Sequence, residues 1–372
     1  MRQDCLSENI GSIFLSYYND AVFSAASLAL SSLLENPSEN WFANIGTVDE
    51  KKRQNVHEHS LFDLASLTKP LVTLPSVLHL IDTGIISWDE SLSSLLERDV
   101  PQPFGEVSLA NLLSHHAGFT AHEDYWKTLK SMQNDRQAAW LIEEIINSDP
   151  AYETGGSHRY SDLGYLLLGY IIELKAGKRI DKYWQAFVAE PLGMEDELHY
   201  PAAPGKDVFG PYVPTGVCRW SGRALTGVVH DDNSRALGGI TGHAGLFGSS
   251  SAVLALCKEF FFLYHGLPSR LPILSETFKQ ACSRVRGSEW TCGFNLPSPS
   301  GSSSGRWFSP NSIGHLGFTG VSFWIDIDRG LIVCLLTNRV VKGESREGIR
   351  AMRSEVHDAV VACLPDTPRN SR

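Results

Sequence analysis

The sequence lacks most of the features that assign a protein to a class at once. It has no apolar run long enough to span a membrane, no block of like charges and no internal repeat. Its 32 Lys and Arg residues are outnumbered by 42 Asp and Glu residues, which leaves a net charge of -10. Nucleic acids and anionic membranes are bound by basic patches, so we expect neither as a partner.

Cysteine and histidine patterns typical of metal or cofactor sites are missing as well. The seven cysteines contain no C-x-x-C pair and are odd in number. We therefore expect reduced, mostly buried thiols in a reducing compartment, with neither a disulfide framework nor a zinc site. The histidines weighed as metal ligands are His57, His59, His115, His116, His230 and His243. They show no H-E-x-x-H or similar spacing, and the glycines of residues 238–248 do not form G-x-G-x-x-G after a strand. We expect no metal and no cofactor.

What is present describes an ordinary soluble globular chain. Of its 372 residues, 42% are apolar and 20% are charged, and this length suits two domains or one large domain with an insertion. Residues 21–34 are apolar and small, but Asp4, Glu8 and Asp20 precede them and no small-residue cleavage site follows, unlike in a signal peptide. We expect a strand or helix of the fold there, and a cytoplasmic protein.

Hydrophobic periodicity predicts the order of the elements. One predicted helix carries Ser66 and ends at Gly84. The other predicted helices are 1–20, 91–96, 108–113, 122–148, 163–175, 181–188, 249–264 and 344–363. The predicted strands are 22–30, 41–48, 321–327 and 331–337, the last two joined by a tight turn. We expect residues 197–240 to be irregular and ordered around a site. The Pro/Ser/Gly-rich residues 296–305 are predicted to form a mobile hairpin tip, and whether it closes over a pocket stays open.

This order, strands followed by a helical block and then by strands and a terminal helix, indicates an α+β fold. We predict a mixed domain built on an antiparallel sheet from residues 1–65 and 236–372. A mostly helical domain, residues 66–235, would be inserted between these segments. The site is expected in the cleft between the two domains.

The candidate nucleophile is Ser66 in Ser66-x-x-Lys69, which occurs once in the chain. Residues three apart on a helix face the same side, so the lysine amine can reach the serine hydroxyl. The amine can accept the serine proton only if it is partly deprotonated, which burial and a helix N-terminus favour. Pro70 suits a first helical turn, whereas Pro75 predicts a kink.

Two further motifs follow in order, Tyr160-Ser161-Asp162 at a turn that opens a helix and Gly314-His315-Leu316-Gly317-Phe318-Thr319-Gly320. With them the chain resembles the penicillin-recognising serine hydrolases, that is class C β-lactamases, D-alanyl-D-alanine carboxypeptidases and related esterases. The resemblance spans nearly the full length and includes Leu112-Leu113-Ser114-His115-His116-Ala117-Gly118, Val229-His230-Asp231-Asp232-Asn233 and Gly242-His243-Ala244-Gly245-Leu246-Phe247.

The resemblance implies the β-lactamase/transpeptidase-like fold and a set of roles. Ser66 would be acylated, Lys69 and Tyr160 would share its proton, and the backbone N–H groups of Ser66 and Phe318 would form the oxyanion hole. The remaining candidates, Asp162, His315, Gly317 and His243, would line the substrate pocket. Asp162 would orient Lys69 or a substrate amide. The charge of His315 would depend on pH near neutrality.

Two departures from the family pattern bear on the substrate. His315 stands where β-lactam-hydrolysing members have a lysine, and Asp162 stands where they have an asparagine. Both changes weaken the case for β-lactam hydrolysis. We expect a small ester or a D-amino-acid-containing peptide amide as substrate and leave carboxypeptidase and esterase activity undivided. A β-lactamase and a non-catalytic penicillin-recognising sensor are the alternatives, and the oligomeric state is not predicted.

Simpler interpretations of the motifs stay open at this point. Ser66 alone would serve as a helix cap, although that leaves Lys69 unexplained. Tyr160-Ser161-Asp162 alone would be a capped turn, and Tyr17-Tyr18-Asn19 also fits Tyr-x-Asn but precedes the serine. His116 and His243, like His315, stand in a His-x-Gly sequence. We expect His116 to have a structural role at the end of a helix.

Overall fold

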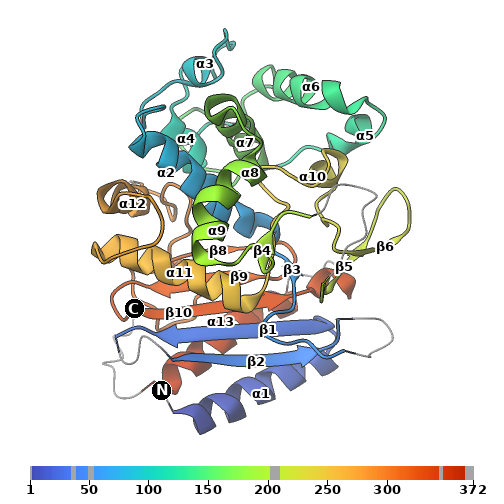
Figure 1. Cartoon of the computed structure of the whole chain (residues 1–372), viewed down its shortest axis with the longest axis vertical. Coiled ribbons are helices and arrows are strands. Elements are labelled where there is room, and N and C mark those ends of the chain that lie inside the picture. The colour runs from blue at the N-terminus through green and yellow to red at the C-terminus, as the bar shows by residue number, and fades with distance from the viewer. Residues whose placement is uncertain are drawn as a thin grey trace.

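The computed structural model describes residues 2–34, 39–48, 54–201, 210–285, 287–342 and 347–364. Its centre is a five-stranded antiparallel sheet with the order β2-β1-β10-β9-β8 (Figure 1). The strands are β1 (Ala25–Ser32), β2 (Asn40–Gly46), β8 (Ile313–Leu316), β9 (Ser322–Asp326) and β10 (Leu331–Thr337). Strands from both ends of the sequence thus lie side by side, with Leu28 opposite Leu335. The predicted antiparallel sheet is confirmed, and β8, which carries His315, adds an edge strand.

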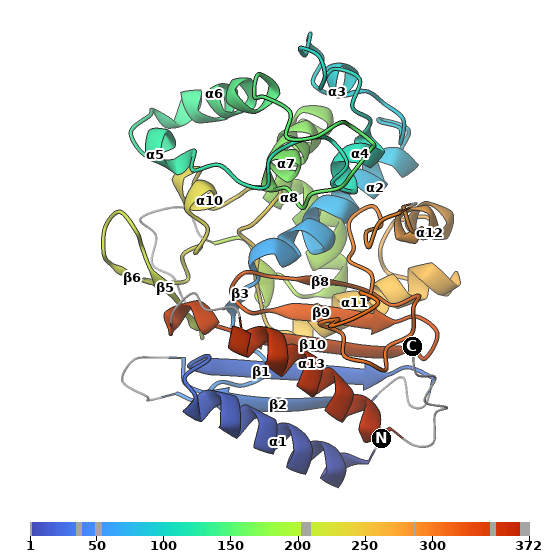
Figure 2. The ribbon, with the colours of Figure 1, turned by 180° about the vertical axis from the view of Figure 1, so that it is seen from behind.

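Both faces of the sheet are covered by helices. Helices α1 (Gln3–Asn19) and α13 (Glu347–Ala362) lie side by side across one face, and α11 (Ser250–His265) covers the other (Figure 2). All eight residues of β1 are buried, and successive side chains alternate between the two cores. Leu28 and Leu30 pack in the cluster with α1 and α13, whereas Ala29 packs in the cluster on the α11 side. The apolar run that resembled a signal peptide is therefore an inner strand.

The remaining helices gather mostly beyond the β8 edge of the sheet (Figure 1). They are α2 (Leu74–Asp82), α3 (Leu92–Leu95), α4 (Leu109–Leu113), α5 (Trp126–Leu129), α6 (Asn134–Ile146), α7 (Asp162–Ala176), α8 (Ile180–Trp184), α9 (Glu190–Leu192), α10 (Asp232–Ala236) and α12 (Ser275–Cys282). A small sheet pairs β3 (Phe62–Asp63), β7 (Phe247–Gly248) and β4 (Leu198–His199), and β5 (Pro214–Val217) pairs with β6 (Ala224–Thr226). None of the helices in the described ranges is long and apolar enough to cross a membrane.

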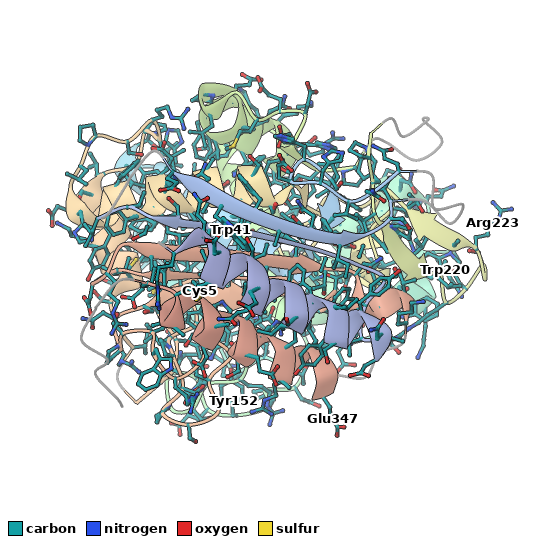
Figure 3. The ribbon with its side chains drawn as sticks, turned by 90° about the horizontal axis from the view of Figure 1, so that it is seen from below. Cys5, Trp41, Tyr152, Trp220, Arg223 and Glu347 are labelled. Atoms are coloured by element: carbon teal, nitrogen blue, oxygen red, sulfur yellow. A yellow bond between two sulfur atoms is a disulfide. The ribbon has the colours of Figure 1, made fainter. Side chains whose placement is uncertain are left out.

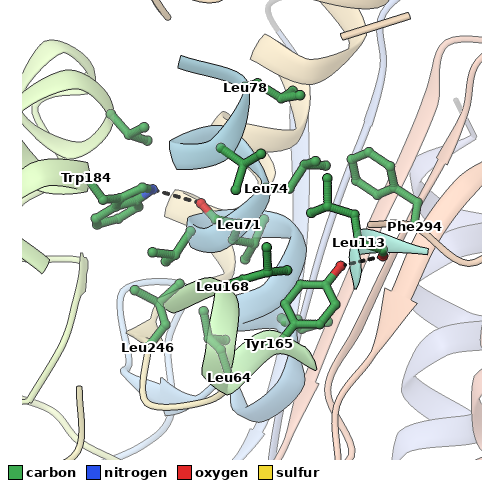
Figure 4. Close-up of a cluster of buried hydrophobic side chains, with 14 of the residues drawn as sticks. Leu64, Leu71, Leu74, Leu78, Leu113, Tyr165, Leu168, Trp184, Leu246 and Phe294 are labelled. Carbon is green, nitrogen blue, oxygen red and sulfur yellow. Dashed lines mark hydrogen bonds between the residues drawn. The ribbon is translucent and has the colours of Figure 1, made fainter. Parts of the chain in front are cut away.

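The helix that carries Ser66 is irregular in a way that its prolines explain. It begins as a 3₁₀ turn, Ala65–Leu67, continues as a π-helical turn, Lys69–Thr73, and becomes α2. Pro75 has no N–H for the carbonyl of Leu71 four residues before it. The indole N–H of Trp184 donates to that carbonyl instead, at 2.8 Å (Figure 4). The irregularity predicted at Pro75 thus takes the form of a π-helical turn, a feature common at functional sites.

Other predicted elements shift or split. The helical pattern over residues 122–148 divides into α5 and α6, and the pattern over 163–175 is α7, which ends at Gly177 in the left-handed conformation as expected of a helix C-terminus. Residues 197–240 are largely irregular, as predicted, with 202–209 outside the described residues. The final helix begins at Glu347, and the three residues predicted before it lie outside the described part.

The end of the segment 296–305, which was predicted to form a mobile hairpin tip, is packed against α13. Ser302 and Ser304 are buried, and a Cβ on Gly305 would lie 2.4 Å from a carboxylate oxygen of Asp358 on α13. The neighbouring Arg306 donates to the same carboxylate through its backbone N–H. Residues 302–305 are thus packed onto α13, and the serine-rich composition reflects a tight turn with buried hydroxyls.

The prediction of reduced thiols is wrong for one pair of cysteines. Cys5 near the start of α1 and Cys363 just after α13 form a disulfide, with Cα atoms 5.7 Å apart (Figure 3 labels Cys5). The pair could not be inferred from spacing because 358 positions separate the two residues. The other five cysteines are free and buried, as predicted. With the disulfide, the cysteine argument for a reducing compartment no longer holds.

Candidate active site

Ser66 is the accessible point of an otherwise buried segment. From Ser60 to Leu78 every residue except Ser66 is buried. The turn before it is left-handed at Ala65, with a φ of 46°, a conformation that alanine rarely adopts. The Asp63 carboxylate accepts a hydrogen bond from the Ala65 N–H at 2.8 Å, and the Ala65 carbonyl accepts one from the Thr68 hydroxyl at 2.7 Å. These two bonds stabilise the turn that presents Ser66.

The Asp63 carboxylate also joins this turn to the 229–236 segment. Its second oxygen accepts a hydrogen bond from the His230 N–H at 2.7 Å. Burial raises the pKa of Asp63 to about 6, although the two backbone N–H groups oppose the rise. Asp63 therefore links the turn before Ser66 to the segment that contains His230.

Lys69 is fully buried and its ammonium has three hydrogen-bond partners. Its Nζ lies 3.3 Å from Ser66 Oγ, 2.7 Å from Asp162 Oδ1 and 3.0 Å from the carbonyl oxygen of His243. Burial alone would lower the pKa of Lys69, but Asp162 and then Tyr160 together outweigh it, and the pKa is raised. The spacing of Ser66 and Lys69 therefore predicted their contact, whereas the expectation of a partly deprotonated lysine is wrong for this resting state.

Tyr160 lies against the same two residues. Burial raises the pKa of its hydroxyl, although the Lys69 ammonium opposes the rise and Ser66 lies close enough to do so as well. The ammonium is 4.9 Å from the centroid of the tyrosine ring. The ring packs against His115 and Trp290, with centroid distances of 4.7 and 5.5 Å. The structure thus brings Ser66, Lys69 and Tyr160 together, as the family resemblance implied.

Asp162 begins α7 and pairs with Lys69. Ser161 caps this helix by accepting a hydrogen bond from the Leu163 N–H. The second oxygen of Asp162 lies 3.2 Å from Nδ1 of His122. Burial opposes ionisation of Asp162, but Lys69, followed by His122, outweighs it and holds the pKa of the carboxyl below its usual range. Of the two expected partners of Asp162, Lys69 and a substrate amide, the structure shows the first.

His243 contacts the site through its backbone. Its carbonyl oxygen accepts from Lys69, while its imidazole is hydrogen-bonded to Asp231 Oδ1 and to the Thr241 hydroxyl, each at 2.9 Å. Burial favours the protonated form of Asp231, but His243 outweighs it and lowers the pKa of that carboxyl to about 2. The imidazole is therefore held by hydrogen bonds to Asp231 and Thr241.

His315 lies on β8 beside Tyr160, with ring centroids 5.9 Å apart. Its Nδ1 donates to the carbonyl of Leu316 at 2.9 Å, which leaves Nε2 as the unprotonated nitrogen of the neutral ring. Burial, and then Lys69, lowers the pKa of His315 to about 3. The expectation that its charge changes near neutral pH is therefore wrong, because this imidazole is neutral throughout that range.

The turn after β8 packs directly on the Ser66 segment. A Cβ on Gly317 would lie 2.9 Å from the carbonyl oxygen of Leu64 and 2.3 Å from a methyl of Val321, so only glycine fits. The Thr319 hydroxyl donates to the carbonyl of Asp63 at 2.7 Å. The close approach of Gly317 to Leu64 and Val321 explains why the third motif has a glycine after Leu316. The same packing brings Phe318 beside the segment that carries Ser66.

Several groups around this centre were not predicted to belong to the site. His122 on a loop and Asp231 at the start of α10 have no sequence spacing that relates them to Ser66. His115, within a quoted motif, accepts a hydrogen bond from the Ser161 N–H at 3.2 Å and thus supports the turn that carries Tyr160. His116 bonds the carbonyl of Ser114, the structural place expected for it. No cluster of metal-ligating side chains occurs within the described ranges.

Comparisons with known proteins agree with this arrangement. The family model described as Beta-lactamase matches residues 32–357. The chain is 26% identical over 308 residues to a putative D-alanyl-D-alanine carboxypeptidase of Escherichia coli O157:H7, which covers 75% of this chain and 69% of that protein. It is 27% identical over 310 residues to an N-acetylmuramyl-L-alanine amidase of Bacillus subtilis (strain 168), covering 75% and 68%.

Solved structures share the fold. EstCE1, a hydrolase with promiscuous acyltransferase activity, superposes with a TM-score of 0.72 at 18% identity, covering 96% of this chain and 98% of that one. A class C beta-lactamase from Rhodobacter sphaeroides gives a TM-score of 0.70 at 17% identity, covering 95% and 99%. The predicted fold is thereby confirmed. Because the family model covers most of the sequence, the chain belongs to the β-lactamase family of penicillin-binding-protein-like serine hydrolases.

Proposed function

We propose that this chain hydrolyses a small ester or a D-amino-acid-containing peptide amide through an acyl-enzyme on Ser66. The observation that carries the proposal is the 3.3 Å contact between the Lys69 ammonium and the Ser66 hydroxyl, with the Tyr160 ring centroid 4.9 Å from the same ammonium. A serine hydroxyl is a weak nucleophile until a neighbouring group takes its proton. Ser66 is also the accessible residue of its segment, as a nucleophile must be.

The protonation states indicate how Ser66 would be activated. Lys69 and Tyr160 both hold their protons at neutral pH, because the pKa of each is raised. In the reactive form of the enzyme, Lys69 or Tyr160 would therefore lack its proton. That group would take the proton of Ser66 as the serine oxygen attacks the substrate carbonyl. The pair would then pass the proton to the leaving group and later deprotonate the attacking water. Activity is expected to rise with pH as this form becomes populated.

The backbone N–H groups of Ser66 and Phe318 are the proposed oxyanion hole. What supports this is the packing of the Gly317 backbone on residues 64 and 65, immediately before Ser66. Preformed donors of this kind stabilise the tetrahedral intermediate, and losing one costs about 10²–10³ in rate. In this reading Gly317 is required because any side chain would move Phe318 away from the acyl group.

The neutral His315 bears on the choice of substrate. Without a fixed cation at this position, a substrate carboxylate gains no ion pair there, which counts against efficient β-lactam hydrolysis. An ester, or an amide with no carboxylate at that point, suits the site better. A D-peptide amide stays the second candidate because the similar proteins include ones named carboxypeptidase and N-acetylmuramyl-L-alanine amidase.

We also propose that the site lies between two domains, residues 1–65 with 236–372 and residues 66–235. In this division Tyr160 and Asp162 come from the inserted domain, and His315 and Phe318 come from the sheet domain. Ser66 and Lys69 stand at the junction. Relative movement of the domains would then change the distance between the proton-transfer pair and the oxyanion hole.

The test is turnover by the purified chain and by Ser66→Ala. We expect hydrolysis of p-nitrophenyl acetate and butyrate, a higher kcat/KM for the esters than for an acetylated D-alanyl-D-alanine peptide or benzylpenicillin, and loss of all turnover in the variant. Peptide or penicillin turnover above that of the esters would reverse the substrate order. Binding of penicillin without any turnover would favour the sensor alternative.

A further inference from the structure

Arg353 on α13 is a buried cation beneath the turn that joins β8 and β9. Its side chain donates from Nη2 to the carbonyl oxygens of Gly317 at 3.0 Å and Val321 at 2.7 Å. The residue is only 7% exposed. Helix α13 crosses the face of the sheet away from α11 (Figure 2), and from this helix the guanidinium reaches the two carbonyls of the turn.

The burial of the Arg353 charge is energetically unfavourable, which suggests a function for the charge. Within the described ranges no carboxylate lies at ion-pair distance from its guanidinium, and its Nε has no hydrogen-bond partner. Burial, and then Arg339, lowers the pKa of Arg353 to about 9, which still leaves it charged at neutral pH. Burying an unpaired cation is costly, and packing alone would be served as well by a methionine or leucine.

The carbonyl that Arg353 holds belongs to the peptide whose N–H is the proposed oxyanion donor. Gly317 C=O and Phe318 N–H are parts of one planar trans peptide, in which the two groups point in opposite directions. A donor fixed on the carbonyl from one side therefore directs the N–H toward the other. The same guanidinium also holds Val321, whose carbonyl accepts the Gly317 N–H at 2.8 Å, so both ends of the turn are tied to one side chain.

Three other contacts fix the turn, and none of them is made by the Gly317–Phe318 peptide group. The Phe318 ring stacks on His230 at 5.5 Å, and the Arg339 guanidinium lies 4.6 Å from its centroid. The Thr319 hydroxyl bonds to the carbonyl of Asp63. These contacts set where the turn sits, whereas the rotation of the Gly317–Phe318 peptide is set by the turn's own Gly320 N–H and by Arg353.

We propose that Arg353 is a positioning residue that orients and polarises the Gly317–Phe318 peptide so that its N–H stabilises the oxyanion formed on Ser66. Hydrogen-bonded groups polarise one another, so a cation on the carbonyl strengthens the N–H as a donor. This inference rests on the proposed function. It adds a residue outside the three motifs, contributed by the last helix of the fold.

The test compares Arg353→Met with Arg353→Lys and with Met352→Ala, a buried neighbour on α13 that belongs to the apolar cluster shared by α13 and α1. In Arg353→Met we expect kcat for p-nitrophenyl acetate to fall by about 10²-fold, the loss that a small misplacement produces. KM should change little. The affinity for phenylboronic acid, whose tetrahedral adduct with Ser66 uses the same N–H groups, should fall with kcat/KM. Arg353→Lys, which retains the charge, should lose less.

Met352→Ala controls for a general loss of packing, and thermal unfolding of each variant verifies the comparison. Equal losses of activity in Arg353→Met and Met352→Ala would overturn the proposal, as would unchanged boronate affinity in an impaired Arg353→Met. If Arg353→Met does not fold, Arg353→Lys decides by the same two readouts. A wild-type chain without ester turnover would instead refute the proposed function itself, and this inference with it.

Discussion

Replacing Asp162 with asparagine tests the charge balance around Lys69. The Asp162–Lys69 pair joins two groups whose side chains are 16% and 0% exposed, with 2.7 Å between the charged atoms. Removing one partner of a buried ion pair costs about 3–5 kcal/mol. Since Asp162 keeps some contact with water, we expect Asp162→Asn to lower the free energy of unfolding at pH 7 by about 3 kcal/mol.

The pH dependence of that loss follows from the two pKa shifts. The pKa of Asp162 is below its usual 3.8, so its contribution is present above that pH and is lost as pH falls through the lowered value. The pKa of Lys69 is raised above 10.5, so its contribution is present below that pH and is lost as pH rises through the raised value. At pH 7 both contributions are therefore complete. In Asp162→Asn, the strongest group that opposes the effect of burial is gone and burial favours a neutral Lys69, so the loss of stability should shrink toward pH 10.

The assays are urea unfolding at pH 7 and pH 10, and the pH profile of kcat/KM for p-nitrophenyl acetate. A Lys69 that loses its proton more easily should shift the rising limb of the profile of Asp162→Asn to lower pH. An equal loss of stability at both pH values, or a rising limb that moves to higher pH, would refute the reasoning.

Three further predictions concern the strand edge and the termini. Gly317→Ala should reduce kcat/KM for esters by about 10²-fold or more, because its Cβ would displace the turn from the Ser66 segment; near-wild-type turnover would contradict this. His315→Gln should lower kcat/KM by the same factor at every pH from 5 to 8, since the pKa of His315 is about 3; a ratio that changes tenfold across this range would mean that the imidazole titrates there. Replacing Cys5 and Cys363 with serine should lower the free energy of unfolding by about 2–4 kcal/mol and leave ester turnover unchanged; equal urea midpoints for both proteins would contradict a disulfide.

The part of the site that could be predicted from sequence is the part set by local spacing and motif order. Ser66 and Lys69 lie within one helical turn, so their contact follows from the helix itself. Ser161 as a helix cap follows from the preference for serine at helix N-termini. The antiparallel sheet followed from the order of the elements, with predicted strands near both ends of the chain.

What could not be predicted depends on burial and on long-range pairing. The sequence motif identifies His315 but not its neutrality, which results from its depth and from the nearby ammonium of Lys69. His122 lies 40 positions before its partner Asp162, and Cys5 lies 358 positions before Cys363. No periodic pattern relates residues so far apart, and only the packed fold brings them together.

The most direct test of the central claim is intact-mass spectrometry of the chain after incubation with a fluorophosphonate, alongside Ser66→Ala. The site described here predicts one adduct in the wild-type chain, located at Ser66 by peptide mapping, and none in the variant. An adduct that persists in Ser66→Ala, or a wild-type chain that forms none while correctly folded, would contradict Ser66 as the nucleophile.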